Sequence, residues 1–297
     1  MVASYPNQAI EQRKGLTLAA PAAVLIVVLV LAPLVAVLVL SLTDYRLGDL
    51  SWRFVGLSNY AKLASDPAAR RAVVNTAIYV GTVVPAAVGI GLVLALNIQA
   101  RRRLRRFYEV IFFLPVTSTF VAMALVWQYL LHGRIGPINA WMTALGGRHV
   151  DFLTDPSIAL FSLAAIGVWQ LVGFNTILFL AGLAAIPGDL YEAAELDGMQ
   201  GGMERFLRLT WPLLTPTTLF VTVTTSITAF QVFDSVAALT RGGPMGSTEV
   251  LLFRLFQDAY GQFEIGYGAA LSVVFLGIIL AFASIQTVLS NRRSLAA

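Results

Sequence analysis

Apolar residues gather in six long stretches of the chain that contain no Asp, Glu, Lys or Arg. These charge-free stretches cover residues 15–43, 72–100, 110–133, 156–188, 209–233 and 265–291. Each exceeds the roughly 20 residues that a helix needs to cross the hydrocarbon core of a bilayer. Lipid offers the backbone no hydrogen-bond partner, so such spans must be helical. The pattern predicts six transmembrane helices, near residues 17–42, 73–98, 107–131, 158–181, 209–232 and 267–290.

The overall composition agrees with this pattern. Hydrophobic residues make up 58% of the chain, charged residues 12%, and the mean hydropathy is +0.77. Globular domains are nearer 45–50% apolar and about 25% charged. The expected fold class is therefore an all-α integral membrane protein. The sequence contains no cysteine, which excludes disulfides and thiolate metal sites. Its basic residues flank apolar spans, so nucleic acid is not an expected partner.

Basic residues beside the spans indicate the orientation, because cytoplasmic connections of membrane proteins are enriched in Lys and Arg. Eleven of the twenty Lys and Arg residues lie in the two tails and in the connections after the second and fourth spans. Five of these occur in "RRRLRR", residues 101–106. The other nine are mostly scattered through longer loops, with Arg70 and Arg71 as the main exception. We expect both termini to be cytoplasmic.

The chain is expected to form one membrane domain in three segments. Residues 1–71 would hold a cytoplasmic tail, the first span and an external loop. Residues 72–290 would form a five-helix core with a cytoplasmic loop at 186–212, and residues 291–297 a second cytoplasmic tail. In the external loops, "GPINAWM" and "TEVLLFRLFQDAY" have the spacing of short helices. For the second of these, a surface loop folded onto the bundle is an equal alternative.

Several kinds of chemistry are absent from the sequence. The two lysines, Lys14 and Lys62, do not complete a phosphate-binding P-loop motif, so the chain is not expected to bind ATP. His132 and His149 lack nearby carboxylates at ligand spacing, so no metal site is expected. No serine or zinc hydrolase motif occurs, and the chain is not expected to be an enzyme. The middle of each predicted span also lacks the Asp, Glu, Lys and Arg residues that mark proton-coupled carriers.

The spans do carry uncharged polar groups, which have two interpretations. Ser, Thr, Asn and Gln often join helices by hydrogen bonds within membranes. Alternatively, they line a pathway for a hydroxyl-rich solute, with a tryptophan available to stack on a sugar ring. The candidates for a substrate pathway are Gln170, Asn175, Thr225, Thr228, Gln231 and Trp169.

An acidic segment interrupts this apolar background at "IPGDLYEAAELDGMQGG", residues 186–202. Asp189 and Glu192 have the spacing of a capping box, which predicts a helix that begins at Asp189. Ala193 and Ala194 favour a helix and add little bulk, and Gly198 is expected to end or bend it. The residues predict a short cytoplasmic helix with a bare face that another protein can approach.

The segment "EAAELDG", followed by "LTWP" at residues 209–212, resembles the EAA loop of ABC importer permeases. Other parts of the chain resemble the carbohydrate branch of that family, the maltose-type permeases, and in particular its first, maltose-F-like subunit. These parts are "RFYEVIFFLP", "ALVWQYLL…GPIN", "WQLVGFNTILFLAGLAAIP", "FQVFDSV…LTRGGP" and "GYGAALSV". Ten residues separate Gly198 from Leu209, one more than is usual in the family.

The resemblance implies a type I ABC importer permease fold and an EAA helix that seats in a cytoplasmic ATPase. It implies coupling roles for Glu192, Ala193, Ala194, Asp197 and Gly198. It also implies a multi-pass protein of the bacterial inner membrane. The implied partners are a second permease subunit, an ATPase dimer that holds ATP and magnesium, and an external solute-binding protein.

A neutral sugar or oligosaccharide is the expected solute. A buried phosphate favours Arg or helix N-termini, and the predicted spans contain no Lys or Arg. A phosphorylated solute such as glycerol 3-phosphate is the alternative within the family, because the second permease could supply an arginine. A stand-alone secondary transporter and a structural scaffold are the alternatives from other classes.

Overall fold

The computed structural model describes the backbone of residues 18–100, 119–199 and 202–294, and the side chains of those up to residue 288. The arginine-rich segment 101–106, the beginning of the third predicted span and the ends of both tails lie outside the described residues. The helices are α2 (Ala32–Leu40), α3 (Ser58–Ser65), α4 (Pro67–Ala100), α6 (Phe120–Leu130), α7 (Pro137–Ala144), α8 (Ala159–Ala184), α9 (Gly188–Leu196), α10 (Gly202–Arg205), α11 (Trp211–Phe230), α12 (Leu251–Phe256) and α13 (Ile265–Ser294). Four π-helical turns join them: η1 (Val27–Leu31), η2 (Phe206–Thr210), η3 (Val236–Thr240) and η4 (Gln257–Gly261).

Five described helices are long and apolar enough to cross a membrane. They are Leu18–Leu40, Pro67–Ala100, Ala159–Ala184, Gly202–Phe230 and Ile265–Val288. These confirm five of the six predicted spans, but the fifth begins at Gly202 and not near residue 209, so that prediction was wrong about its start. The third predicted span is represented by the predominantly apolar helix α6, which has eleven residues, and the beginning of the span lies outside the described residues. Both short helices expected in the external loops are present. The segment "GPINAWM" forms α7, and the segment "TEVLLFRLFQDAY" forms α12 and η4.

The second span begins at Pro67 and not near residue 73, so that prediction was wrong about its start. The Asp66 carboxylate accepts a hydrogen bond of 2.8 Å from the backbone N–H of Ala68, which is how a helix N-cap residue acts. Pro67 follows at the first helical position, where its missing N–H has no consequence. Asp66 and Pro67 therefore start the helix before the charge-free stretch. Arg70 and Arg71, which the sequence pattern assigns to the external loop, lie within α4.

Contacts divide the chain into two compact units. Unit 1 contains the chain up to Ser65 together with Leu255–Val274, and unit 2 contains Asp66–Arg254 and the chain from Phe275 onward. Each unit is held together by its own interactions.

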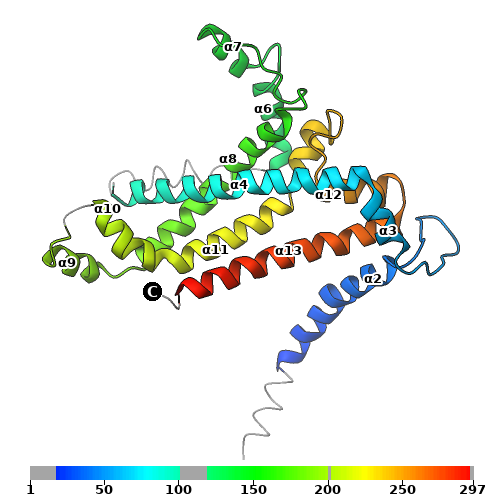
Figure 1. Cartoon of the computed structure of the whole chain (residues 1–297), viewed down its shortest axis with the longest axis horizontal. Coiled ribbons are helices and arrows are strands. Elements are labelled where there is room, and N and C mark those ends of the chain that lie inside the picture. Colours follow the sequence, from blue (N-terminus) through cyan, green and yellow to red (C-terminus); the bar gives the residue numbers. More distant parts are fainter. Residues whose placement is uncertain (1–17, 101–118, 200–201, 295–297) are drawn as a thin grey trace, which may run out of the picture. The chain divides into compact units, whose positions relative to one another are not determined.

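Unit 2 is built around α4, α8 and α11, which pack pairwise against one another (Figure 1). Its buried core includes Val83, Leu163, Phe179 and Leu214. Small residues let the helices approach closely, as is usual between membrane helices. A Cβ at Gly91 of α4 would lie only 2.9 Å from the Cβ of Asn175 on α8, so the close contact at this point depends on glycine.

The segment before α12 is fixed to α4 by hydrogen bonds within unit 2. The Asn75 side-chain amide donates to the carbonyls of Gly246 and Glu249 at 3.0 and 2.9 Å. The Thr76 hydroxyl accepts the backbone N–H of Leu251 at 2.9 Å. Arg254 pairs with the carboxylates of Asp66 at 3.4 Å and Glu249 at 3.3 Å. These bonds set the path of the chain that leaves α11.

Unit 1 is organised around polar contacts outside the spans. Asn59 of α3 donates to the carbonyls of Ser41 and Thr43, each at 2.8 Å. Glu264 pairs with Lys62 at 2.6 Å and with Arg46 at 2.8 Å. The hydrogen bond from Lys62 is the main cause that lowers the pKa of the Glu264 carboxyl below its usual value. The two cations therefore hold Glu264 in its charged form.

Candidate coupling helix and polar cavity

The acidic segment at residues 186–202 contains the helix α9, Gly188–Leu196. Its N-cap residue is Pro187, and no side chain forms a hydrogen bond to the helix start. The predicted capping box was therefore wrong. The extended backbone of Pro187 starts the helix one residue earlier than Asp189, which places Asp189 inside the first turn. An acidic side chain still interacts favourably with the positive end of the helix there.

The end of α9 agrees with the prediction that Gly198 terminates it. Gly198 has φ +87°, in the left-handed region. Its backbone N–H donates to the Glu195 carbonyl at 3.1 Å, and the N–H of Met199 donates to the Ala194 carbonyl at 2.9 Å. These two bonds form a Schellman motif, in which a left-handed residue turns the chain away from the helix axis. The position therefore requires the conformational freedom of glycine.

One face of α9 packs against the chain that leads into α11. Ala194 is only 6% exposed. The Tyr191 hydroxyl lies 3.2 Å from the Thr210 hydroxyl, and Glu195 pairs with Arg205 at 2.8 Å. The expectation that both alanines form a bare face is therefore met by Ala193 alone, which is exposed.

The other face of α9 is exposed and acidic. Asp189, Glu192 and Asp197 are exposed on it, and Leu196 is 90% exposed. Within the described part of the chain, the Glu192 carboxylate has no hydrogen bond or ion pair. An acidic surface with an apolar centre suits a partner that presents basic side chains around an apolar groove.

The chain between α9 and α11 contains the ten residues that separate Gly198 from Leu209, one more than is usual in the EAA loop of the family that the sequence resembles. Before α11 it forms the π turn η2, Phe206–Thr210. A π turn takes up one more residue than the corresponding α turn. Pro212 follows in the first turn of α11. The π turn thus offers a place where the extra residue is accommodated within the helix.

The polar residues predicted for a pathway separate into two groups. Asn175 and Thr225 are 0% and 3% exposed, and the Thr225 hydroxyl donates to the Asn175 carbonyl oxygen at 2.9 Å. This bond joins α8 to α11, as expected of polar groups that hold membrane helices together. The structure therefore favours a packing role for these two residues.

Gln170, Thr228 and Gln231 come together at a small cavity of about 120 Å³ in unit 2. Its other lining residues are Tyr79, Phe120, Gly167, Leu171, Ala229, Val232, Phe233, Asp234 and Ser235. Gln231 is exposed, so its amide is available to a solute. The volume is below the roughly 300 Å³ of usual ligand pockets. The cavity is therefore the size of part of a solute site.

Trp169 does not line this cavity. Its ring packs edge to face on Trp127, with centroids 5.2 Å apart and an interplanar angle of 77°. Stacking of Trp169 on a sugar stays a prediction.

The sequence interpretation missed Asp234, which also lines the cavity and is the one charged residue among the described lining residues. The sequence feature that could have identified Asp234 is its position directly after the charge-free stretch that ends at Phe233. The aromatic rings of Tyr79, Phe120 and Phe233 were missed as well, because aromatic residues in a span are ordinarily assigned to packing.

Comparison with known proteins defines the class. The family of binding-protein-dependent transport system inner membrane components matches residues 87–295, and the chain belongs to this family. A probable ABC transporter permease of Pyrococcus horikoshii is 31% identical over 86% of this chain and 88% of its own length. The sn-glycerol-3-phosphate transport system permease protein UgpA of Agrobacterium fabrum is 32% identical over 80% of each chain. The sulfoquinovosyl glycerol transport system permease protein SmoG of the same organism is 30% identical over 88% of this chain and 85% of its own.

The fold agrees with that family. A chain from the crystal structure of a bacterial alginate ABC transporter superimposes with a TM-score of 0.84 at 20% identity. The match covers 98% of this chain and 99% of the other. The protein is a permease subunit of a binding-protein-dependent ABC importer and has the type I permease fold.

Proposed function

We propose that this chain forms half of the pathway by which an ATP-driven importer carries a neutral sugar or oligosaccharide across the bacterial inner membrane. A second permease subunit provides the other half. Two copies of an ATPase bind on the cytoplasmic side, where both termini of this chain also lie, and hold ATP and magnesium. An external solute-binding protein delivers the sugar. This chain itself binds no cofactor and contributes passage and coupling, not catalysis.

The cavity around Gln170, Thr228 and Gln231 is the observation that carries the choice of solute. Amide and hydroxyl groups both donate and accept hydrogen bonds, which matches the hydroxyls of a sugar. Aromatic rings beside them suit the apolar face of a sugar ring. Since the cavity is smaller than a usual ligand pocket, a matching surface on the second permease completes the site.

The second candidate is a phosphorylated solute. The name of the relative UgpA, an sn-glycerol-3-phosphate permease protein, favours it. The charge of the cavity disfavours binding of a phosphorylated solute, because Asp234 is negative and the described lining residues include no cation. A phosphate placed there would meet a carboxylate and no balancing charge.

The helix α9 supplies the coupling in this proposal. Its exposed acidic face, with Glu192 and Ala193 at its centre, seats against the ATPase. Tyr191 and Glu195 transmit the movement of the ATPase to α11 through their contacts with Thr210 and Arg205. Asp197 and Gly198 end the helix at the edge of this contact.

Uptake into proteoliposomes that contain the complete transporter tests the proposal. We expect ATP-driven uptake of a neutral saccharide and none of glycerol 3-phosphate. Gln231→Ala removes a hydrogen bond to the solute, so it should raise the KM roughly threefold to tenfold, with normal expression and assembly.

Asn175→Ala is the matched control for Gln231→Ala. It should leave the KM unchanged and lower the stability of the protein by about 0.6 kcal/mol, the average for an interhelical hydrogen bond in a membrane. An unchanged KM in Gln231→Ala would show that this side chain does not contact the solute. Uptake of glycerol 3-phosphate alone would favour the phosphorylated solute, the second candidate. Uptake in liposomes that lack the ATPase would establish a secondary transporter instead.

A further inference from the structure

A larger cavity, of about 500 Å³, lies in unit 2 away from the residues already discussed. Three segments line it: the end of α6 and the turn after it, the segment before α8, and the end of η3 with the turn after it. Its lining residues are Gln128, Leu131, His132, Gly133, Arg134, Asp151, Phe152, Leu153, Thr154, Leu239, Thr240, Gly243 and Pro244. It shares no lining residue with the smaller cavity around Gln231. Its volume falls within the usual range for a small-molecule site.

The cavity lies at the opposite end of α8 from the coupling helix. Residues 151–154 precede α8, and α9 follows it in the chain. The 26 residues of α8 separate these ends by roughly 39 Å at the rise of an α-helix. With α9 on the cytoplasmic side, as the proposed function has it, this cavity is on the side from which solute arrives.

The walls of the cavity are held in place by local hydrogen bonds. The backbone N–H groups of Arg134 and Ile135 donate to His132 Nδ1 at 3.2 and 3.4 Å. On the far wall, the Thr248 hydroxyl bonds to Thr240 Oγ1 at 2.8 Å and to the Gly243 carbonyl at 2.6 Å. The cavity is thus formed before any ligand enters it.

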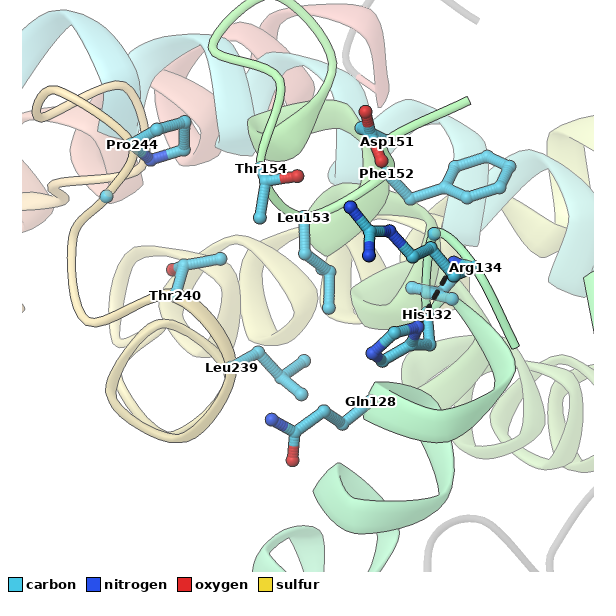
Figure 2. A pocket seen from close by; sticks show the side chains of 13 residues that line it. Gln128, His132, Arg134, Asp151, Phe152, Leu153, Thr154, Leu239, Thr240 and Pro244 are labelled. Carbon is cyan, nitrogen blue, oxygen red and sulfur yellow. Dashed lines mark hydrogen bonds between the residues drawn. The ribbon is translucent and has the colours of Figure 1, made fainter. Parts of the chain in front are cut away.

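These bonds also define the chemistry of His132. Because Nδ1 accepts two backbone N–H groups, the neutral ring carries its proton on Nε2. Nε2 faces toward Leu239 and Gln128, so the ring offers a donor to the cavity (Figure 2). Figure 2 also shows Arg134, His132 and Gln128 on one side of the space, opposite Thr240, Leu239 and Pro244.

The polar groups of the cavity include both donors and acceptors. Arg134 and His132 donate, the Asp151 carboxylate accepts, and Gln128 and the threonine hydroxyls do both. Within the described part of the chain, the side chains of Arg134 and Asp151 form no ion pair, so both retain their capacity for a ligand. Among the described lining residues, the one arginine and the one carboxylate balance in charge.

This combination of donors and acceptors favours one class of ligand. Neighbouring hydroxyls of a sugar donate and accept together, so a guanidinium and a carboxylate in the same cavity can satisfy them. An anion could bind Arg134 but could not donate to Asp151, whose carboxylate would repel it. Leu131, Leu153 and Leu239 supply apolar walls for the carbon skeleton.

We propose that this cavity binds a neutral saccharide at the external end of the permease, as a separate site ahead of the pathway around Gln231. The inference rests on the proposed function only for the side of the membrane on which the cavity lies. Arg134 and Asp151 are the residues that recognise the sugar hydroxyls.

Hydrogen exchange of the complete transporter in lipid nanodiscs, without the binding protein, tests this proposal. Maltose, trehalose and raffinose serve as neutral probes, and glycerol 3-phosphate serves as the anionic probe. We expect at least one saccharide to protect residues 128–134 and 151–154, and the anion to protect neither segment. Arg134→Ala and Asp151→Asn should each weaken that protection by about tenfold in apparent affinity, since each removes a hydrogen bond to a charged group.

Arg148→Ala is the matched control, because Arg148 is an exposed arginine in the same loop that does not line the cavity. It should leave the affinity unchanged, and all three variants should keep the ATPase rate and melting temperature of the wild type. The absence of protection by every saccharide would overturn the proposal, as would equal affinity in Arg134→Ala. Protection of these segments by the sugar-free binding protein would also overturn it, by showing a protein contact.

ATP-driven uptake, measured on the same preparations with the binding protein added, separates this inference from the proposed function. Uptake without saccharide protection of the two segments would overturn the external site alone. Protection without uptake would support the site and contradict the proposed function.

Discussion

Gly198→Val is expected to reduce ATP-driven uptake by at least about tenfold, because a side chain in the left-handed region costs roughly 1–2 kcal/mol and more for a β-branched residue. Gly198 holds φ +87° and forms the two hydrogen bonds that end α9. A Cβ at this position would meet no atom within 4 Å, so the effect comes from backbone conformation and not from a clash. The chain after α9 would leave the helix in another direction and displace the coupling helix.

Gly198→Asn provides the matched control, since asparagine tolerates the left-handed region better than other non-glycine residues. It should retain most of the uptake at equal expression and equal assembly with the partner subunits. The comparison is made by initial rates of uptake in proteoliposomes. Equal losses in the valine and asparagine variants would show that the backbone conformation of Gly198 is not what coupling requires.

Glu192→Lys is expected to abolish uptake, with a loss of about 100-fold or more, because a like charge placed against a basic partner costs several kcal/mol. Glu192 is exposed on the acidic face of α9 and has no partner within the described part of the chain. Because the side chain is exposed, reversing its charge should leave the fold of this subunit unchanged. Uptake and substrate-stimulated ATPase activity should therefore fall together.

Two variants make the result on Glu192 specific. Glu192→Gln keeps the shape of the side chain and removes its charge, so it should lose less activity than the lysine variant. Asp49→Lys makes the same reversal of charge at an exposed loop residue of unit 1 and should transport normally. Normal uptake in Glu192→Lys would contradict the coupling role of the acidic face.

The charge-free stretches predicted the spans because the part of a helix that lies in the hydrocarbon core rarely contains a charged residue. The helix ends were harder to predict, because they depend on which residue starts the helix. Asp66 and Pro67 extend the second span beyond its charge-free stretch, so that α4 includes two arginines. At α9, Pro187 starts the helix, and the capping pattern of Asp189 and Glu192 therefore has no role there. In contrast, Gly198 was predicted correctly because few residues other than glycine adopt the conformation that ends α9.

The roles of the polar span residues could not be separated by sequence, because all are uncharged and hydrogen-bond in the same ways. Gln170 and Asn175 differ by five positions on α8, which places them roughly 140° apart around the helix. One faces the cavity, and the other is buried against α11. Asp234 lies outside the charge-free stretches, and its position at the cavity emerges only when the chain after α11 is folded back.

Site-specific cross-linking at the two alanines of α9 tests the central claim most directly. The chain contains no cysteine, so Ala193→Cys and Ala194→Cys each create a single attachment point for a photoreactive maleimide. Ala193 is exposed, whereas its neighbour Ala194 is buried at 6% exposure. In the complete transporter we predict an adduct between residue 193 and the ATPase whose yield changes when ATP is added, and little or no adduct from residue 194. Active transporter in which residue 193 forms no adduct with the ATPase would contradict the account.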